Sequence, residues 1–411
     1  MKRIVAKFGG TSLENGQLVR KAAKSVKDEL EKGDTQIAVV VSAMGGMTDK
    51  LIMDAMDGTN ENISKKDLDS IMGMGEKISA RMFATTLRSL DIEAKAVTPT
   101  DPEWPIITNS VAGDATPDLE KTEKKIREEI LSIMEDDVVP VICGFLGKDE
   151  SGTETTIGRG GSDITAFLVG NCVDATDVIL VTDAEGVMTA DPRLLDDTEI
   201  LDELTTRELV DLARYGSKIV HHNALKYKGA DVNAKVIHYM NGNLSSEGTT
   251  IRGDSPAIDG AKVEMHDESL AMVTVVGEGM QETPGVLSDS FKPLQEKGIN
   301  IFGISIGPRS YSIYIEDRKV NEAMELLHEK VKKSDTMKST TVENGVAMIV
   351  AESEKFIDTP GVISKLSDPL AEENLNVIEI YSSQASISFF VAWDNRERAY
   401  ELLQESVKEV V

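Results

Sequence analysis

Two glycine-rich clusters contain the residues best suited to handle phosphate. In the first, "VAKFGGTSL", an apolar run ends at Lys7 and is followed by Gly9 and Gly10. Bare glycines let backbone N–H groups approach phosphate oxygens, and Thr11 and Ser12 can cap the helix that follows. Because the lysine precedes the glycines, this is not a Walker A loop, and the dinucleotide pattern G-x-G-x-x-G is absent. A lysine that merely reaches solvent from a strand end is the simpler alternative.

The second cluster, "TTIGRGGSDITA", contains Arg159 among three glycines. These glycines are Gly158, Gly160 and Gly161. The planar fork of an arginine suits a carboxylate or a phosphate. Ser162 or Asp163 stands where the next helix should begin, and two interpretations of Asp163 stay open. It is either a plain helix cap or an acidic group that orients nearby cations and keeps them charged.

Two later stretches, "VTDAEGVMTADPR" and "LARYGSKIVHHNAL", offer further polar groups. Thr182 and Asp183 end an apolar run, where they can hydrogen-bond a ribose or a base edge. Arg193 and Lys218 can reach phosphates. Neither stretch is diagnostic by itself.

The histidines and cysteines do not form a metal-binding pattern. His221 and His222 are adjacent, so their side chains diverge on a helix or strand, and no third ligand is evident; a structural or capping role is favoured. Cys143 and Cys172 each lie in an apolar or small-residue stretch. They are expected to be buried free thiols rather than a disulfide or a metal site.

The charge balance excludes several kinds of partner. The chain has 411 residues, and 44 Lys plus Arg against 71 Asp plus Glu give a net charge of -27. This argues against nucleic acid and against an anionic membrane surface. The N-terminus does not resemble a signal peptide, and no uncharged stretch approaches the roughly 20 residues of a membrane span. A cytoplasmic location is therefore expected.

The first 250 or so residues alternate apolar, β-rich runs with amphipathic stretches, which predicts a mostly parallel sheet covered on both faces. The expected strands are Arg3–Phe8, Gln36–Met44, Ala94–Pro99, Val138–Leu146 and Asp177–Asp183. The expected helices are Gln17–Glu31, Leu68–Leu90, Asp118–Met134 and Asp163–Asn171. The glycine-rich segments fall at the carboxyl ends of the strands, where such sheets bind ligands.

After a polar bridge, "NGNLSSEGTTIRGDSPAIDG", the chain contains an internal repeat with a shift of 76 residues. "TPGV" at 283–286 returns at 359–362, and "GINI" at 298–301 aligns with "NLNV" at 374–377. "SYSIYI" at 310–315 aligns with "SISFFV" at 386–391. Matches in a single register predict two copies of a β-α-β-β-α unit.

The second copy runs out of chain before a fourth strand. We expect residues 261–267, "AKVEMHD", to complete its sheet, and the alternative is an edge that is open or paired with another subunit. The expected domains are 1–258, a catalytic α/β domain, followed by 268–335 and 343–411, two ferredoxin-like βαββαβ domains.

Taken together, these motifs resemble the aspartate kinases, members of the amino acid kinase family that carry two C-terminal ACT domains. "KFGGTS" and "GRGGSD" are the most specific marks. They are supported, in the family's order, by "VSAMGGMT", "GMGEKISARMF", "ITNSVAGDA", "TDAEGV", "DPR" and "YGSKIVH". The resemblance covers nearly the whole chain and implies a three-layer αβα kinase domain followed by the ACT pair.

The resemblance also implies the roles of individual residues. The catalytic residues would be Lys7, Arg159, Asp163 and Lys218. ATP would be bound by Lys7, Phe8, Gly9, Gly10, Ser12, Thr182, Asp183, Met188, Arg193, Lys218 and Ile219. Aspartate would be bound by Ser42, Thr48, Glu76, Arg159, Gly160, Gly161 and Ser162, with Glu76 on the α-ammonium group. Mg²⁺ would be held mainly by the phosphates rather than by protein side chains.

The family's reaction moves the γ-phosphoryl group of ATP to the β-carboxylate of L-aspartate. It is the first step toward lysine, threonine and methionine, or ectoine. ACT domains bind amino acids, here lysine or threonine, between copies, so a homodimer or homotetramer formed through them is expected. Asn300 and Asn376 stand at the position that often contacts the effector, although a simple turn asparagine is an equal alternative.

Three positions depart from the family pattern. His222 and Asn223 replace the usual Pro-Arg, Met188 replaces a frequent tyrosine, and residues 237–240 replace Arg-Asn-Thr-Phe. These changes concern adenine packing, domain coupling and regulation rather than the phosphate-binding set. Two rival functions stay open: a related kinase with another acceptor, and a non-catalytic ACT-based amino acid sensor.

Overall fold

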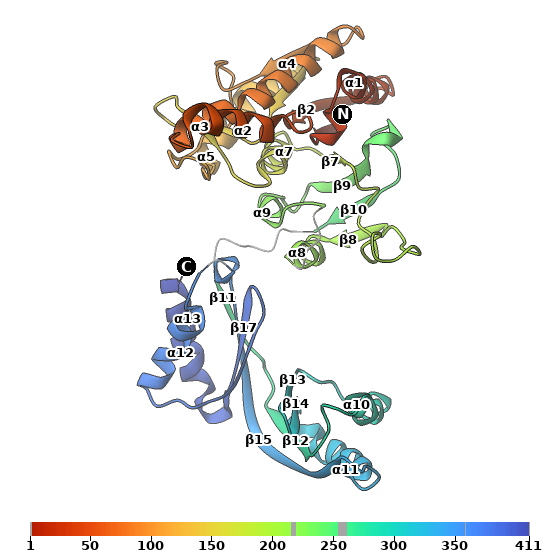
Figure 1. Cartoon of the computed structure of the whole chain (residues 1–411), viewed down its shortest axis with the longest axis vertical. Coiled ribbons are helices and arrows are strands. Elements are labelled where there is room, and N and C mark those ends of the chain that lie inside the picture. Colours follow the sequence, from red (N-terminus) through yellow and green to blue (C-terminus); the bar gives the residue numbers. More distant parts are fainter. Residues whose placement is uncertain (1, 215–218, 254–260, 358, 411) are drawn as a thin grey trace. The chain divides into compact units, whose positions relative to one another are not determined.

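The computed structural model describes residues 2–214, 219–253, 261–357 and 359–410. These residues belong to two units, Met1–Ala257 and Ile258–Val411 (Figure 1). Each unit has its own hydrophobic core. Within the described residues, no helix combines the length and the apolar character that crossing a bilayer requires.

An eight-stranded sheet forms the centre of the first unit. In spatial order its strands are β3 (Ala94–Val97), β4 (Val139–Cys143), β2 (Thr35–Val41), β1 (Lys2–Phe8), β7 (Asp177–Thr182), β9 (Asn233–His238), β10 (Thr249–Arg252) and β8 (Glu203–Thr205). All neighbours from β3 to β9 are parallel, whereas β10 runs antiparallel to β9. The five predicted strands and the mostly parallel sheet are confirmed.

The last three strands were not predicted from the sequence. β8 and β10 have only three and four residues, and β9 begins with Asn233 and contains Lys235. None of them has the long apolar run that identifies a buried strand. The expected polar bridge is wrong in part, because its residues 249–252 form β10 within the first sheet.

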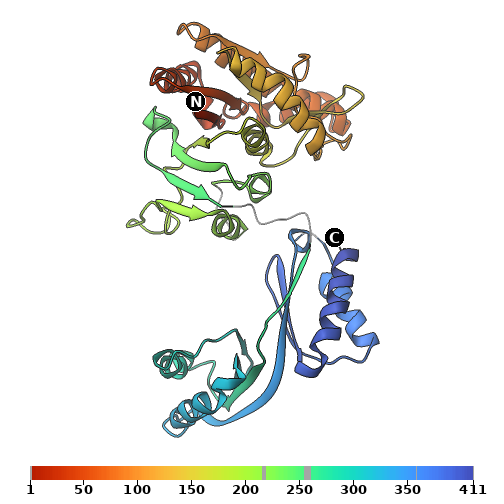
Figure 2. The ribbon, with the colours of Figure 1, turned by 180° about the vertical axis from the view of Figure 1, so that it is seen from behind.

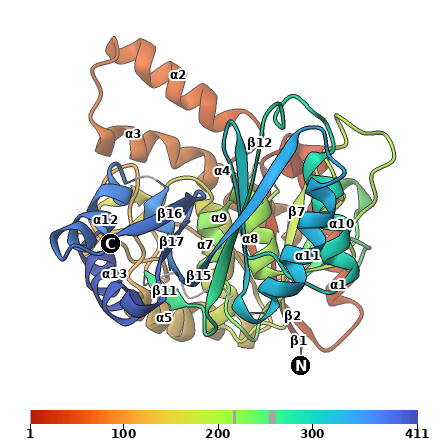
Figure 3. The same ribbon diagram turned by 90° about the horizontal axis from the view of Figure 1, so that it is seen from below.

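The helices of the first unit are α1 (Gly16–Leu30), α2 (Met47–Thr59), α3 (Lys65–Met72), α4 (Met74–Arg88), α5 (Leu119–Lys125), α6 (Leu131–Glu135), α7 (Gly161–Cys172), α8 (Thr206–Arg214) and α9 (His222–Leu225). A π-helical turn, Ile126–Ile130, joins α5 to α6. The helix predicted over 68–90 is interrupted at Gly73, which packs closely against Leu146. α2, which packs against α3 and α4 (Figure 3), was not predicted from the sequence, although Leu51, Ile52, Ala55 and Met56 have the spacing of one helical face.

The two faces of the central strand contact different helices. Phe8 faces α4, where its ring lies 5.1 Å from the ring of Phe83. Val5 faces α7 and packs near Gly170. Side chains alternate along a strand, so Lys7 lies on the same face as Val5 and is directed toward α7.

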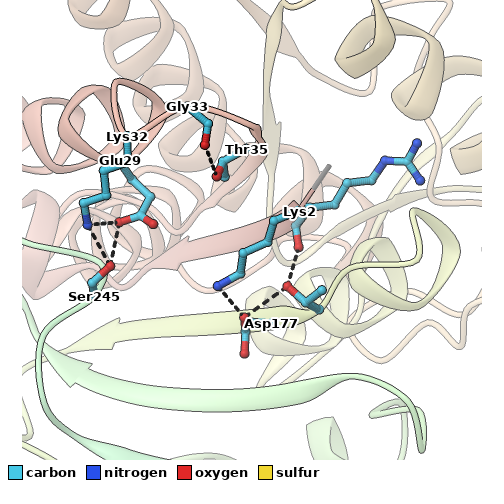
Figure 4. Close-up of polar contacts among 9 residues, drawn as sticks. Lys2, Glu29, Lys32, Gly33, Thr35, Asp177 and Ser245 are labelled. Atoms are coloured by element: carbon cyan, nitrogen blue, oxygen red, sulfur yellow. Dashed lines mark hydrogen bonds and ion pairs between the residues drawn. The ribbon is translucent and has the colours of Figure 1, made fainter.

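Polar contacts at the amino-terminal edge of this sheet join segments that are distant in sequence (Figure 4). Lys2 of β1 pairs with Asp177 of β7 at 2.9 Å. Glu29 of α1 accepts hydrogen bonds from Lys32 at 2.6 Å and from Ser245 at 2.8 Å. Burial raises the pKa of Glu29, but these two hydrogen bonds, together with the charges of Lys32 and Lys2, more than offset it and hold the pKa below its usual value.

The second unit repeats one pattern twice. Its first copy contains β12 (Leu270–Gly277), α10 (Val286–Glu296), β13 (Gly303–Ile306), β14 (Ser310–Glu316) and α11 (Val320–Val331). The second contains the end of β15 (Met337–Glu352), then α12 (Val362–Glu372), β16 (Val377–Ser382), β17 (Ser386–Ala392) and α13 (Arg396–Val410). α10 and α12, and likewise β14 and β17, begin 76 residues apart and are equally long. The predicted repeat is confirmed.

One long strand joins the two copies into a single sheet of order β13-β14-β12-β15-β17-β16 (Figure 2). The first part of β15 pairs with β12 and supplies the fourth strand of the first copy. Its last residues pair with β17 and begin the second copy. β11 (Lys262–Met265) pairs with this last part, at Val263 opposite Ala351, so the second copy receives its fourth strand from the segment that precedes the first.

Polar groups of both copies meet on one face of this sheet. The hydroxyl of Tyr314, from the first copy, donates a hydrogen bond at 2.7 Å to Glu379 of the second. The hydroxyl of Tyr381 donates to the same carboxylate oxygen at 3.3 Å. Burial is the main cause that raises the pKa of Tyr314, and the neighbouring Glu379 carboxylate raises it further. The hydroxyl therefore keeps its proton and acts as a donor.

Candidate active site

A cavity of about 380 Å³ opens at the carboxyl-terminal edge of the first sheet, where the sequence predicted ligand binding. Its walls come from the ends of β1 and β2, the starts of α2 and α4, and the segment that leads into α7. The predicted residues among its lining are Lys7, Gly10, Ser42, Thr48, Glu76, Arg159, Gly160, Gly161, Ser162 and Asp163. The fold therefore brings together residues of both glycine-rich clusters.

An ion pair between Lys7 and Asp163 lies on the cavity wall. The Nζ of Lys7 is 2.7 Å from Oδ1 of Asp163, and the two side chains are 14% and 12% exposed. The pair forms because β1 directs Lys7 toward α7 and Asp163 lies in the first turn of that helix. Asp163 does not cap α7, since Gly160 occupies that position. Of the two interpretations, the carboxylate that orients a cation is the one that the geometry supports.

The loop after β1 differs in detail from its prediction. The N–H of Gly9 donates to the carbonyl of Val181 at 3.1 Å, so this donor is already engaged. Ser12 is buried, and its hydroxyl donates to the carbonyl of Gly9 at 2.6 Å. The expected capping of the next helix by Thr11 or Ser12 is wrong, because Asn15 caps α1 through its side chain.

Gly10 is required by close packing rather than by an unusual backbone angle. A Cβ atom at this position would lie 3.0 Å from the carbonyl oxygen of Ala43, which follows β2. The missing side chain thus lets the loop after β1 approach the loop after β2, and both loops line the cavity. This contact joins residues that are more than 30 positions apart in the sequence.

The loop before α7 presents Arg159 to the cavity. Arg159 is exposed, and no described side chain forms an ion pair with it. Gly160 has a φ of +80°, and a Cβ atom there would lie 2.7 Å from Cβ of His221. Both the backbone angle and the close contact require glycine. The arginine is therefore held between two glycines whose placement is restricted.

Glu76 contributes a buried carboxylate to the cavity. It is 3% exposed, and its Oε1 accepts a hydrogen bond from the N–H of Ala43 at 3.2 Å. Its Oε2 is buried and has no hydrogen-bond partner among the described residues. Burial raises the pKa of Glu76 from 4.5 to about 7. A buried carboxylate with a free oxygen can bind a cationic group of a ligand.

Some lining residues were not predicted from the sequence as site residues. These are Ala43, Met44, Gly45, Gly46, Asp49, Phe145 and Gly158. The glycine-rich segment "VSAMGGMTD", at the carboxyl end of an expected strand, is the available sequence signal for most of them. Asp49 lies in the first turn of α2, a helix that was not predicted from the sequence, so its position depends on tertiary structure.

The predicted nucleotide-binding residues lie outside this lining, apart from Lys7 and Gly10. Thr182 ends β7, and its hydroxyl donates to the exposed Asp183 at 3.1 Å. The side chain of Phe8 is 1% exposed and packs in the core, so any contact with a nucleotide is limited to its backbone. Lys218 lies outside the described residues.

Three further nucleotide-binding candidates follow β7 in the sequence. Met188 forms an isolated bridge with Ile200, and Ile219 packs against the core of the first unit. Arg193 is 80% exposed and pairs with Asp191 at 2.7 Å, which holds the pKa of Asp191 at about 2. A phosphate would have to compete with Asp191 for this arginine.

The adjacent histidines contact each other and the start of α9. The side chain of His221 caps α9 by accepting a hydrogen bond from the N–H of Asn223, so the predicted capping role is confirmed for this residue. The rings of His221 and His222 are stacked, with centroids 4.5 Å apart. In the part of the chain that the structure describes, no three His, Cys, Asp or Glu side chains are grouped to hold a metal ion.

The two candidate effector residues lie in equivalent places of the second unit. Asn300 and Asn376 are exposed, and they precede β13 and β16. Gly298 and its counterpart Asn374 have φ values of +63° and +58°. The two loops therefore turn in the same way before these asparagines, although the loop sequences differ.

Comparisons with known proteins agree with this geometry. The model of the amino acid kinase family matches residues 2–238, and it thus covers β1 to β9 and every lining residue of the cavity. The chain belongs to the amino acid kinase family. Two ACT-domain models match residues 273–331 and 341–405, which correspond to the two copies of the repeat.

Relatives of this amino acid kinase include aspartokinase 1 of Bacillus subtilis, 29% identical over 94% of this chain and 94% of that protein. An aspartokinase of Thermus thermophilus is 28% identical over 99% of this chain and 98% of that protein. Solved structures with the same fold include aspartate kinase from Synechocystis, with a TM-score of 0.79 at 24% identity over 98% of this chain and 69% of that one. E. coli aspartokinase III in complex with aspartate and ADP has a TM-score of 0.54 at 22% identity, over 99% of this chain and 100% of that one.

Proposed function

We propose that this chain is an aspartate kinase that transfers the γ-phosphoryl group of ATP to the β-carboxylate of L-aspartate, producing 4-phospho-L-aspartate and ADP. The observation that carries the proposal is the Lys7–Asp163 ion pair on the wall of a cavity that also contains Arg159 and the buried Glu76. Aspartokinase relatives that align over nearly the whole chain support the same acceptor.

The acceptor carboxylate needs no general base. An aspartate side chain titrates near pH 3.9, so it is already ionised at neutral pH. One of its oxygens attacks the γ-phosphorus, the O–P bond to the acceptor forms, and the bond to the β,γ-bridging oxygen breaks. The barrier comes from bringing anions together, so positioning and charge neutralisation are the tasks of the protein.

Lys7 supplies the cation for the transferring group. Its ammonium group is mostly buried, which strengthens its interaction with a nearby phosphoryl oxygen. Asp163, at 2.7 Å, restricts the ammonium group to one place. Lys218 is a second catalytic cation in this proposal, on the basis of the family motif alone.

Two groups select aspartate. The guanidinium of Arg159 has a geometry that suits a substrate carboxylate, and the carboxylate of Glu76 pairs with the α-ammonium group. Ser42, Thr48 and Ser162 line the pocket between them. Binding of the ammonium group lowers the pKa of Glu76 from about 7, because an opposite charge favours the ionised form. Aspartate binding therefore releases a proton near neutral pH.

ATP enters as its Mg²⁺ complex. The nucleotide-binding residues in this proposal are those of the loop after β1, Thr182 and Asp183 at the end of β7, and Met188, Arg193, Lys218 and Ile219. Mg²⁺ is coordinated mainly by the phosphates in this proposal, since it usually binds through substrate phosphates and retained waters. One solved relative is named as a complex with aspartate and ADP, the product of such a transfer.

The ACT pair makes the enzyme subject to feedback by an amino acid, lysine or threonine. We place effector contacts at Asn300 and Asn376, between the ACT domains of a homodimer or homotetramer. A structure of E. coli aspartokinase III in complex with lysine and aspartate supports this class of ligand. The product feeds reactions that reduce and extend the aspartate carbon chain, toward lysine, threonine, methionine or ectoine.

A hydroxylamine-trapping assay tests the function. Acyl phosphates react with hydroxylamine to give hydroxamates, so the purified chain with MgATP should produce a hydroxamate with L-aspartate. It should not do so with glutamate, N-acetylglutamate or carbamate as acceptors. Formation with another acceptor alone would assign a different kinase of this family. No hydroxamate with any acceptor, together with tight amino acid binding in calorimetry, would identify a non-catalytic sensor.

A further inference from the structure

His221 contacts the loop that presents Arg159. A Cβ atom at Gly160 would lie 2.7 Å from Cβ, 3.1 Å from Cγ and 3.4 Å from Nδ1 of His221, so the imidazole packs directly on the backbone of Gly160. Gly160 is next to Arg159 and caps α7, which carries Asp163 in its first turn. A displacement of His221 would therefore move the backbone between the two charged residues of the site.

The hydrogen bond of His221 defines its protonation state. Nδ1 accepts from the N–H of Asn223 at 3.3 Å, so in this arrangement Nδ1 carries no proton and the ring is neutral with its proton on Nε2. A second proton on Nδ1 would face the N–H group of Asn223 and would remove the cap of α9.

The surroundings of the ring oppose that second proton. His221 is half-buried, and burial lowers the pKa of its imidazole below 6.5. Asp163, which is engaged with Lys7, acts in the opposite direction, while Arg159 and Lys226 lower the pKa further. His222, a further titratable group, is stacked on the ring. An added positive charge would thus appear beside the arginine proposed to bind the substrate.

We infer that neutral His221 is a positioning residue for aspartate binding: it holds the Arg159–Gly160 loop in place, and protonation of its Nδ1 displaces that loop. This inference rests on the proposed function for its kinetic readout, but the placement of the loop can be measured without any substrate. It adds a second proton-sensitive group to the site, distinct from Glu76.

The consequence is a steep loss of aspartate utilisation in acid. Both Glu76 and His221 must be unprotonated in the free enzyme. Below both pKa values, log(kcat/KM) for aspartate therefore rises with pH with a limiting slope of about 2. A site in which only Glu76 titrates has a limiting slope of about 1. At saturating aspartate kcat changes much less, because the protonation acts on the positioning of the substrate.

The decisive variant is His221→Asn. The side-chain oxygen of asparagine takes the place of Nδ1 as the acceptor for Asn223 and does not titrate. At saturating MgATP between pH 5 and 8, its slope should fall to about 1, with wild-type kcat/KM near pH 8. One pH unit below the His221 pKa it should exceed the wild type by about tenfold. His221→Ala, which lacks the acceptor, should raise KM roughly five- to tenfold at all pH values with little change in kcat.

His266→Asn is the matched control. His266 lies in the second unit, and its Nδ1 likewise contacts the backbone two residues later, at 3.2 Å from the nitrogen and 3.0 Å from the carbonyl oxygen of Glu268. This variant should keep the wild-type pH profile. An unchanged slope in His221→Asn would overturn the inference, and so would a loss of slope in both variants.

Nuclear magnetic resonance of the substrate-free enzyme gives the second readout. With ¹⁵N-glycine labelling, the amide signals of Gly160 and Gly161 should shift with the His221 titration in the wild type and not in His221→Asn. The neutral ring should carry its proton on Nε2. A proton on Nδ1 of the neutral ring, or amide signals of Gly160 and Gly161 that do not shift as His221 titrates, would refute the positioning role. These measurements apply even if the chain phosphorylates no aspartate. Glycine signals that follow the titration in a chain without kinase activity would instead refute the proposed function alone.

Discussion

Replacement of Lys7 by methionine should abolish most of the phosphoryl transfer while the fold is retained. Methionine keeps most of the length and apolar volume of the lysine stem and removes only the charge. In the structure, the side chain of Lys7 is 14% exposed, and its Nζ lies 2.7 Å from Oδ1 of Asp163 at the cavity wall. A charge about 4 Å from a phosphoryl oxygen interacts by about 4 kcal/mol at an effective dielectric constant of 20. We therefore expect kcat/KM to fall by about a thousandfold.

The loss of charge has to be separated from the unpaired carboxylate that it leaves behind. Asp163 is 12% exposed, and a buried charge without its partner destabilises the protein. The double variant Lys7→Met with Asp163→Asn removes both charges and should recover thermal stability without recovering turnover. If the double variant regains more than a tenth of wild-type turnover, the cation is not what accelerates the reaction.

The same strand supplies the control for this experiment. Lys2 begins β1 and pairs with Asp177 at 2.9 Å, at the edge of the sheet opposite to the cavity (Figure 4). Lys2→Met should change the free energy of unfolding by less than about 1 kcal/mol and leave turnover unaffected, because exposed ion pairs contribute little. The hydroxamate assay and thermal unfolding of the three variants and the wild type give all the needed measurements. Turnover of Lys7→Met within threefold of wild type would refute the proposed role.

Three further predictions concern other parts of the molecule. Folding raises the pKa of Glu76 from 4.5 to about 7, so between these pH values the native state keeps a proton that the unfolded state has lost. The free energy of unfolding should therefore fall by about 3 kcal/mol as the pH rises from 4.5 to 7. Urea titrations of Glu76→Gln should lack this decline. Gly160→Ala should reduce kcat/KM at least tenfold, because the added Cβ would clash with His221. Gly152 has a similar φ of +84° but open space around it, so Gly152→Ala is the control and should retain activity. Equal losses in both variants would point to backbone strain rather than to the clash. Tyr314→Phe should lower the free energy of unfolding, measured in urea, by about 1–3 kcal/mol, because Glu379 loses the shorter of its two tyrosine hydrogen bonds. An unchanged urea midpoint would show that the hydrogen bond from Tyr381 alone satisfies Glu379.

The local pattern of the sequence was sufficient for much of the architecture. Apolar runs bounded by turn residues identified five of the six strands that run parallel from β3 to β9, since burial on both faces demands continuous β-branched residues. The 76-residue shift identified both copies of the ACT unit, including helices and strands of equal length. The same reasoning missed β8, β9 and β10, which lack a long apolar run. It also missed α2, although the apolar residues of that helix have helical spacing.

The site was predictable only as a set of residue types. The motifs named Lys7, Arg159, Asp163 and Glu76, but the interpretation of Asp163 stayed open until its distance to Lys7 was known. Neither the raised pKa of Glu76 nor the engagement of the Gly9 N–H by Val181 could be inferred from neighbours in the sequence. Both depend on groups contributed by other strands and helices, and burial of a carboxylate is a property of the whole fold.

The sequence by itself thus determined the chemistry that the chain can perform, because the identities and the order of charged and glycine residues are local information. The tertiary structure decided how that chemistry is arranged. It directed Lys7 and Phe8 to opposite faces of one strand, toward α7 and α4. It divided β15 between the two copies, supplied β11 to the second, and set His221 against Gly160. These features are contacts between residues that lie far apart in the chain, and only packing brings such residues together.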